Sequence, residues 1–132
     1  LLTLMSGFLL PFTVALVAWF FATGAILWLD RRPEESWGAS ILGATIASGF
    51  AFAAVLISAE SGSVMAAYAG FLATIILWGW HEMSFLMGFV TGPRREACPP
   101  DATGWRRFRL ATATLIHHEI ALALTAVLLV LV

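Results

Sequence analysis

The segment LWGWHEMSFLMGF, residues 77–89, lies in an apolar run long enough to cross a bilayer, yet it carries a histidine and a glutamate side by side. A second apolar run contains TLIHHEIALALTAVLL, residues 114–129, with two histidines and a glutamate. A lone charged side chain at the centre of a membrane helix costs about 2.5–3.5 kcal/mol on insertion scales, so such residues usually face the bundle interior and pair. The two runs therefore indicate helices whose polar side chains contact one another.

The composition of the chain is that of an integral membrane protein. Of its 132 residues, 61% are hydrophobic and 11% are charged, whereas about a quarter of the residues in a soluble domain are charged. A soluble protein of this length could not bury so much apolar surface. The apolar runs lack the period-2 alternation of barrel strands and are too long for them, which leaves helices as the spanning elements.

We predict an all-α, polytopic membrane protein whose single domain, residues 1–132, is a bundle of four transmembrane helices. A bilayer core about 30 Å thick needs roughly 20 apolar helical residues. The predicted helices cover about residues 4–29, 38–58, 64–90 and 110–132. Because the chain opens with Leu1 and stops inside an apolar run, we expect it to be part of a longer protein.

The arginines predict the orientation of the bundle. All seven lie in two of the three predicted linkers, residues 30–37 and 91–109. These two linkers share one side of a four-helix topology, and the positive-inside rule places that side in the cytoplasm. Both ends of the chain are then expected in the periplasm. Topology alone explains the arginines, although those of the second linker could also contact anionic lipid or an acidic partner surface.

The two polar clusters are predicted to lie at matching depth. His81 and Glu82 stand about nine residues from the cytoplasmic end of the third predicted helix. His117, His118 and Glu119 stand seven to nine residues from the same end of the fourth. At 1.5 Å per residue, both clusters lie roughly 10–14 Å deep. Consecutive helices run antiparallel, so we expect Glu82 to pair with a histidine of the fourth helix and Glu119 to pair with His81.

Three roles for this cluster remain open at the level of the sequence. It is a hydrogen-bond network that locks two helices together, a ligand site, or a proton relay. A neutral imidazole can bind a transition metal or ligate the magnesium of a chlorin axially, with a carboxylate to orient it. The candidate cofactor-binding residues are His81, His117 and His118 as axial ligands, Glu82 and Glu119 as orienting partners, and the flanking Trp80.

A single transition metal is the alternative ligand of the same cluster. The available metal ligands are His81, Glu82, His117, His118 and Glu119. A di-iron site in a helix bundle needs about four carboxylates and two Glu-x-x-His motifs, whereas this chain has two intramembrane glutamates and no such motif. We therefore exclude a di-iron oxidase and assign no catalytic residue.

Three blocks of the sequence resemble a known family. They are WFFATGAILWLD at residues 19–30, WGWHEMSFLMGFVTGPRREACPP at residues 78–100 and GWRRFRLATATLIHHEIALALTA at residues 104–126. Together they are similar to the photosynthetic complex assembly protein 2 family (PuhE) of purple phototrophic bacteria. The resemblance covers essentially the whole chain and corresponds to the N-terminal half of that family, which continues after the fourth helix.

The resemblance implies residence in the bacterial inner, intracytoplasmic membrane and a role in assembling the reaction centre–light-harvesting 1 complex. It implies binding or delivery of bacteriochlorophyll or a tetrapyrrole precursor. The implied partners are the bilayer, subunits of the reaction centre or light-harvesting 1 complex, and pigment-synthesis proteins, with no nucleic acid. A metal-dependent membrane enzyme of tetrapyrrole metabolism and a structural accessory subunit without its own cofactor stay open as alternatives, so enzyme activity is left open, with a role other than catalysis favoured.

Overall fold

The computed structural model describes residues 2–132, with side chains from residue 7 onward. The elements of this part are α1 (Leu2–Asp30), the short 3-10 helix η1 (Glu34–Ser36), α2 (Trp37–Ala59), α3 (Val64–Leu86) and α4 (Gly104–Leu131). Residues 2–132 contain no strand, and each of the four α-helices is long and apolar enough to cross a membrane. The predicted all-α membrane fold with four spanning helices is confirmed.

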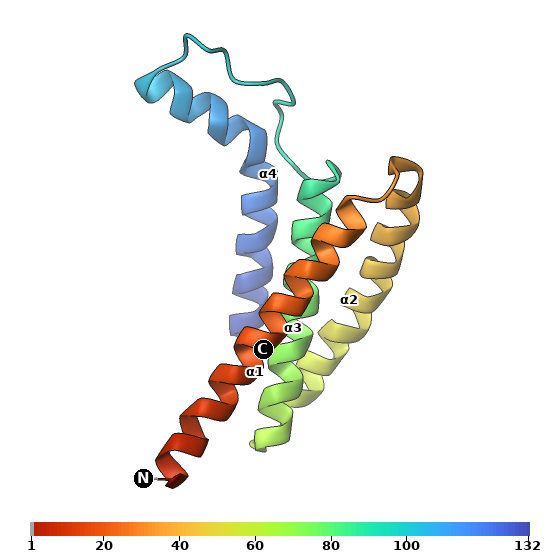
Figure 1. Ribbon diagram of the computed structural model, residues 1–132, viewed down its shortest axis with the longest axis vertical. Helices are drawn as coiled ribbons and strands as arrows, with labels where there is room; N and C mark the ends of the chain where they lie inside the picture. The colour runs from red at the N-terminus through yellow and green to blue at the C-terminus, as the bar shows by residue number, and fades with distance from the viewer. Residues whose placement is uncertain (1) are drawn as a thin grey trace.

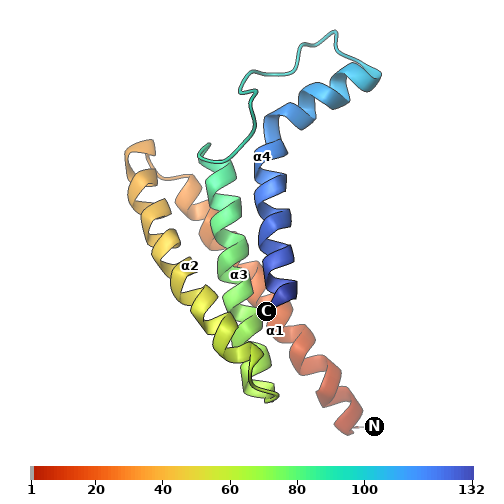
Figure 2. The same cartoon turned by 180° about the vertical axis from the view of Figure 1, so that it is seen from behind.

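Helix α3 lies at the centre of the bundle and contacts the other three α-helices. It packs most extensively against α2, less against α1 and least against α4. Figure 1 shows the linkers that follow α1 and α3 at one end of the molecule and the α2–α3 turn at the other, and Figure 2 shows the same arrangement from behind. The two arginine-bearing linkers therefore share one end of the bundle, as an antiparallel order of helices requires.

The apolar contacts of the bundle join α1, α2 and α3. One buried cluster links α2 to α3, and a second links the end of α1 to the end of α3. From α4, only the partly buried Leu129 packs against the first of them. The buried members are Ala51, Val55, Ala73 and Leu77 in the first cluster, and Ile26, Met83 and Met87 in the second. Helix α4 is thus attached to the bundle by something other than a shared apolar core.

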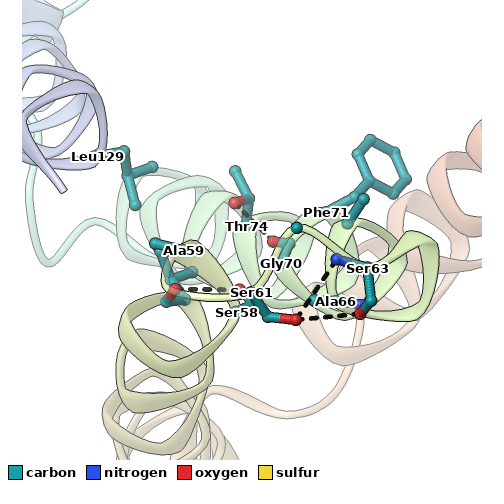
Figure 3. Close-up of a pocket in the computed structure, with 12 residues that line it drawn as sticks. Ser58, Ala59, Ser61, Ser63, Ala66, Gly70, Phe71, Thr74 and Leu129 are labelled. Carbon is teal, nitrogen blue, oxygen red and sulfur yellow. Dashed lines mark hydrogen bonds between the residues drawn. The ribbon is translucent and has the colours of Figure 1, made fainter.

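The turn between α2 and α3 brings these two helices together closely. Ser63 caps α3 by accepting a hydrogen bond from the Ala66 N–H at 3.1 Å. One turn further on, Gly70 faces Ser58 of α2, and a Cβ added at Gly70 would lie 2.8 Å from the Ser58 Oγ atom (Figure 3). Small residues at this contact favour close approach of the two helices, which supplies the van der Waals contact on which membrane helices depend.

We expect Gly70→Ala to lower the free energy of unfolding by about 0.5–1.5 kcal/mol, because the Ser58 side chain must rotate away and give up its hydrogen bond to the Val55 carbonyl. The measurement is reversible unfolding in detergent micelles. The double variant Gly70→Ala with Ser58→Ala should regain most of the loss, because the crowding atom is the Ser58 hydroxyl oxygen. A double variant no more stable than the single one would contradict this account of the contact.

Helix α3 ends at Leu86, four residues before the predicted end at residue 90. Gly88 has a φ of +76°, in the left-handed region that glycine adopts without steric cost. The Phe89 N–H donates to the Ser84 carbonyl at 2.8 Å and the Gly88 N–H to the Phe85 carbonyl at 3.0 Å. This pair of hydrogen bonds is a Schellman motif, which turns the chain off the helix within an apolar stretch.

Helix α4 is bent (Figures 1 and 2). Its upper limb, residues 104–113, is turned away from the bundle, and its lower limb, residues 114–131, lies beside α3. Residues 91–94, which we call the wedge segment, lie against its backbone. The Thr91 carbonyl accepts from the His118 N–H at 3.0 Å, and the Arg94 N–H donates to the Ala113 carbonyl at 2.9 Å. These bonds bracket residues 113–118, where we place the bend. The helix begins at Gly104, six residues before the predicted residue 110.

Gly92 allows the wedge segment to approach α4 this closely. A Cβ at Gly92 would clash with the Ala113 carbonyl oxygen and lie 2.7 Å from the carbonyl carbon of Thr114. These are backbone atoms of a helix, so they cannot move aside as a flexible side chain can. Gly92 is therefore a requirement of the bend.

Gly92→Ala should displace the wedge segment and lower the free energy of unfolding by about 1–3 kcal/mol, as measured by unfolding in micelles. Gly43→Ala is the matched control, because a Cβ there meets no atom within 4 Å and alanine is the better helix former. Equal stability of the two variants would show that the wedge segment does not press on α4.

Candidate binding site between α3 and α4

The buried polar side chains of the described residues meet where α3 faces α4. His81 and Ser84 of α3 are 6% and 0% exposed, and His118 of α4 is 5% exposed. On α3, the buried residues Ala73, Leu77, His81 and Ser84 recur every three or four positions, so they share one face of the helix. The polar pair continues the same stripe that packs against α2 lower in the bundle.

His81 is held by a threonine of α4. Its Nε2 atom lies 2.8 Å from the Thr125 Oγ1 atom, a good hydrogen-bond distance. Thr125 stands seven residues after His118, which is two turns along the same face of α4. The antiparallel helices therefore match His81 with Thr125 and the next turn of α3 with His118.

His118 occupies a more open position. Its Nε2 atom lies 3.9 Å from the Glu82 Oε1 atom, which is too far for a hydrogen bond. The imidazole ring lies 4.7 Å from the Phe85 ring and 6.4 Å from the His81 ring, measured between centroids. Its backbone N–H is bonded to Thr91 of the wedge segment. The loop and the helix together thus place this imidazole beside Glu82.

Three buried polar atoms at this seam have no hydrogen-bond partner: the Nδ1 atoms of His81 and His118, and the Ser84 Oγ atom. A buried polar group left without a partner costs about 1–3 kcal/mol. For His81, either tautomer satisfies the bond to Thr125, because a threonine hydroxyl can donate or accept. In both cases its Nδ1 atom stays unpaired, as a lone pair or as an N–H group. The seam therefore has unused capacity to bind.

The structure brings together some of the predicted site residues and separates others. His81, Glu82 and His118 gather at the seam, and Glu82 faces a histidine of the fourth helix as expected. His117 and Glu119 are exposed, because each is rotated about 100° from His118 around the helix axis. The expected pair of Glu119 with His81 is wrong, since Thr125 holds His81 instead.

Trp80 flanks the site without entering it. Its ring meets the His81 ring edge-on at 5.0 Å between centroids. Its indole N–H donates to the Thr45 hydroxyl of α2 at 2.8 Å, so the side chain is directed toward α2. Trp80 can therefore support the orientation of His81 from the side opposite to α4.

Thr125, Ser84 and Phe85 also belong to the site, although they were not predicted from the sequence. The spacing held a signal for the first two, because Thr125 follows His118 by two full turns and Ser84 follows His81 by one turn. The predicted depth also changes. With α3 ending at Leu86, His81 lies five residues, or about 7 Å, from the end of its helix.

The geometry gives a metal ion little support. Among the described residues, no three His, Cys, Asp or Glu side chains converge as they would around a metal. Of the five residues that the sequence offered as metal ligands, two are turned away. The unpaired nitrogens of the seam belong instead to two separate imidazoles, those of His81 and His118, and each imidazole could form one bond to a ligand.

Comparison with known proteins places the chain in a family. The family model described as Protein of unknown function (DUF3623) matches residues 5–132. The chain belongs to this family. A curated relative, "Uncharacterized 30.4 kDa protein in puhA 5'region" of Rhodobacter capsulatus, is 41% identical over 119 residues, which cover 85% of this chain. The aligned part spans 43% of that relative's length. No solved structure matches the chain.

The hydrogen bond between His81 and Thr125 can be tested by a double-mutant cycle of His81→Ala and Thr125→Val. Interhelical hydrogen bonds in membranes contribute about 0.6 kcal/mol on average, so we expect a coupling free energy of this order in micelle unfolding. The pair Glu119→Ala and Thr125→Val serves as the control, because Glu119 is exposed and should show no coupling. Additive effects of the two substitutions in the first cycle would show that His81 and Thr125 do not form this hydrogen bond.

Proposed function

We propose that this protein is a membrane factor that assists assembly of the photosynthetic reaction centre–light-harvesting 1 complex. In this role it binds or hands over bacteriochlorophyll or a tetrapyrrole precursor at the seam between α3 and α4. The observation that carries the proposal is the pair of buried imidazoles, His81 and His118, whose Nδ1 atoms have no partner.

The chemistry of the seam suits a magnesium tetrapyrrole. Neutral imidazole is a common metal ligand, and a neighbouring carboxylate commonly orients it. His118 is the better candidate because neither ring nitrogen forms a hydrogen bond, and Glu82 lies 3.9 Å from its Nε2 atom. His81 is the second candidate, already fixed by Thr125. The pigment would supply the chromophore and its magnesium, while these residues would bind and orient it.

The packing of α4 supports entry of a flat ligand from the lipid side. Helix α4 makes the least extensive contact with α3, and only Leu129 packs it against the apolar cluster of α2 and α3. Parting α4 from α3 would thus disturb few apolar contacts. Phe85, which lies beside the His118 ring, would offer an aromatic face to the incoming macrocycle.

The comparisons agree with this role at a coarser level. The four spanning helices support a bilayer environment, and the name of the Rhodobacter capsulatus relative locates it in the 5′ region of puhA. The chain also resembles the photosynthetic complex assembly protein 2 family. We extend these points to the inner membrane of a phototroph, with the arginine-bearing linkers in the cytoplasm.

The deciding experiment is an absorption spectrum, from ultraviolet to near infrared, of the protein purified gently from phototrophic membranes. We expect tetrapyrrole bands that are reduced severalfold in His118→Ala, because that variant lacks the imidazole that would hold the pigment. His117→Ala is the matched control, since the neighbouring imidazole is exposed and should leave the bands unchanged. Protein levels of all variants are measured by immunoblot.

Other outcomes would point elsewhere. A spectrum of tryptophan alone, with His118→Ala assembling the photosynthetic complex normally, would overturn the pigment-binding role. Iron or zinc near one equivalent by elemental analysis would favour the metal-dependent enzyme. Co-purification with the finished complex at a fixed ratio, without a cofactor, would favour a structural subunit.

A further inference from the structure

The length of α4 exceeds what the bilayer core can hold in one straight span. The helix has 28 residues, or about 42 Å at 1.5 Å per residue, whereas the core is about 30 Å thick. The 18 residues from Thr114 to Leu131 extend about 27 Å. The lower limb alone therefore nearly spans the core, and the upper limb, residues 104–113, must lie elsewhere.

The bend sends the upper limb sideways at the arginine-bearing end of the molecule. Figure 1 shows it directed away from the other helices, and Figure 2 confirms this from behind. The wedge segment fixes the bend through its bonds to Ala113 and His118. A limb attached to a spanning helix at this level is held at the membrane surface by the chain itself.

The side chains of the upper limb are aromatic and basic. Trp105 and Phe108 are 71% and 58% exposed, and their rings stack with centroids 4.9 Å apart. The three arginines of the limb, at positions 106, 107 and 109, are exposed as well. Arg106 bonds to the exposed Asp101 at 2.9 Å, while Arg107 and Arg109 form no ion pair within residues 2–132. The limb thus has two free cations next to an unburied aromatic pair.

We propose that the upper limb of α4 lies in the membrane interface and binds the phosphate groups of anionic lipids. Aromatic side chains of interfacial helices enter the boundary between headgroups and acyl chains, while arginines contact the phosphates. A hollow of about 440 Å³ on the limb is lined by Trp105, Arg106, Arg109, Leu110 and Ala113. It combines apolar walls with two arginines, of which Arg109 has no ion pair within the described residues, and this combination suits a phosphate ester attached to a glyceride. This inference does not depend on the proposed function.

A lipid fits this surface better than an acidic protein does. The surface of an acidic protein would pair with the arginines but would offer no apolar contact to Trp105 and Phe108. The membrane interface accommodates both kinds of side chain. Arg32 and Trp28 repeat the combination at the same end of the bundle, with the guanidinium carbon 5.2 Å from the indole centroid. The upper limb therefore extends an interfacial belt that begins at the end of α1.

The test uses the whole chain in vesicles, with Cys98→Ser and a nitroxide label on Ala111→Cys, an exposed position of the limb. Power-saturation EPR compares the accessibility of the label to oxygen and to a water-soluble nickel chelate. In vesicles of phosphatidylcholine with phosphatidylglycerol, we expect oxygen to reach the label and nickel to be excluded. The triple variant Arg106→Gln, Arg107→Gln, Arg109→Gln should show a severalfold rise in nickel accessibility.

The control variant Arg31→Gln with Arg32→Gln removes cations from the same end of the bundle and should leave the label shielded. Omitting phosphatidylglycerol should move the label toward water, as the triple variant does. A label open to nickel in the anionic vesicles would overturn the proposal. So would a label shielded equally in the triple variant and in pure phosphatidylcholine, because shielding would then not depend on lipid charge.

Discussion

The polar contact between α3 and α4 determines how the fourth helix joins this bundle. In a bilayer, apolar side chains gain little by leaving lipid for protein, so close packing and interhelical hydrogen bonds must hold helices together. Helices α1, α2 and α3 use close packing, helped by Gly70 where α2 approaches α3. Helix α4 instead relies on the contact of His81 with Thr125 and on the approach of His118 to Glu82. The groups that attach the helix are thus the groups available for chemistry.

The wedge segment links this contact to the ends of the helices. Directly after the turn at Gly88 has closed α3, residues 91–94 bond to the backbone of α4. The same bonds that bend α4 fix the height of His118 along α3. Because Gly92 has no side chain, the loop can touch the helix backbone, and the position of the imidazole becomes a property of the loop as well as of the helix.

The sequence was sufficient for the fold and for part of the site. The length of the apolar runs alone located the four helices. The matching depth of the two polar clusters predicted that Glu82 faces a histidine of the last helix. The sequence did not separate His117 from His118, because adjacent identical residues differ only in rotation about the axis. Their rotation could have been fixed by Thr125, which shares the face of His118. The end of α3 was missed because Met87, Phe89 and Val90 extend an apolar run, whereas the termination depends on the backbone of Gly88.

The linker between α3 and α4 consequently has two parts with different tolerance to change in length. Between Leu86 and Arg94, residues 87–90 bond to the backbone of α3, and Thr91 and Arg94 bond to that of α4, so an insertion or deletion would shift one helix against the other. After Arg94 the chain runs on to Gly104 past Pro99, Pro100 and Asp101 without bonding to the bundle backbone. Loop closure costs little for added residues, so a tag or probe domain inserted here would leave the register of the two histidines intact.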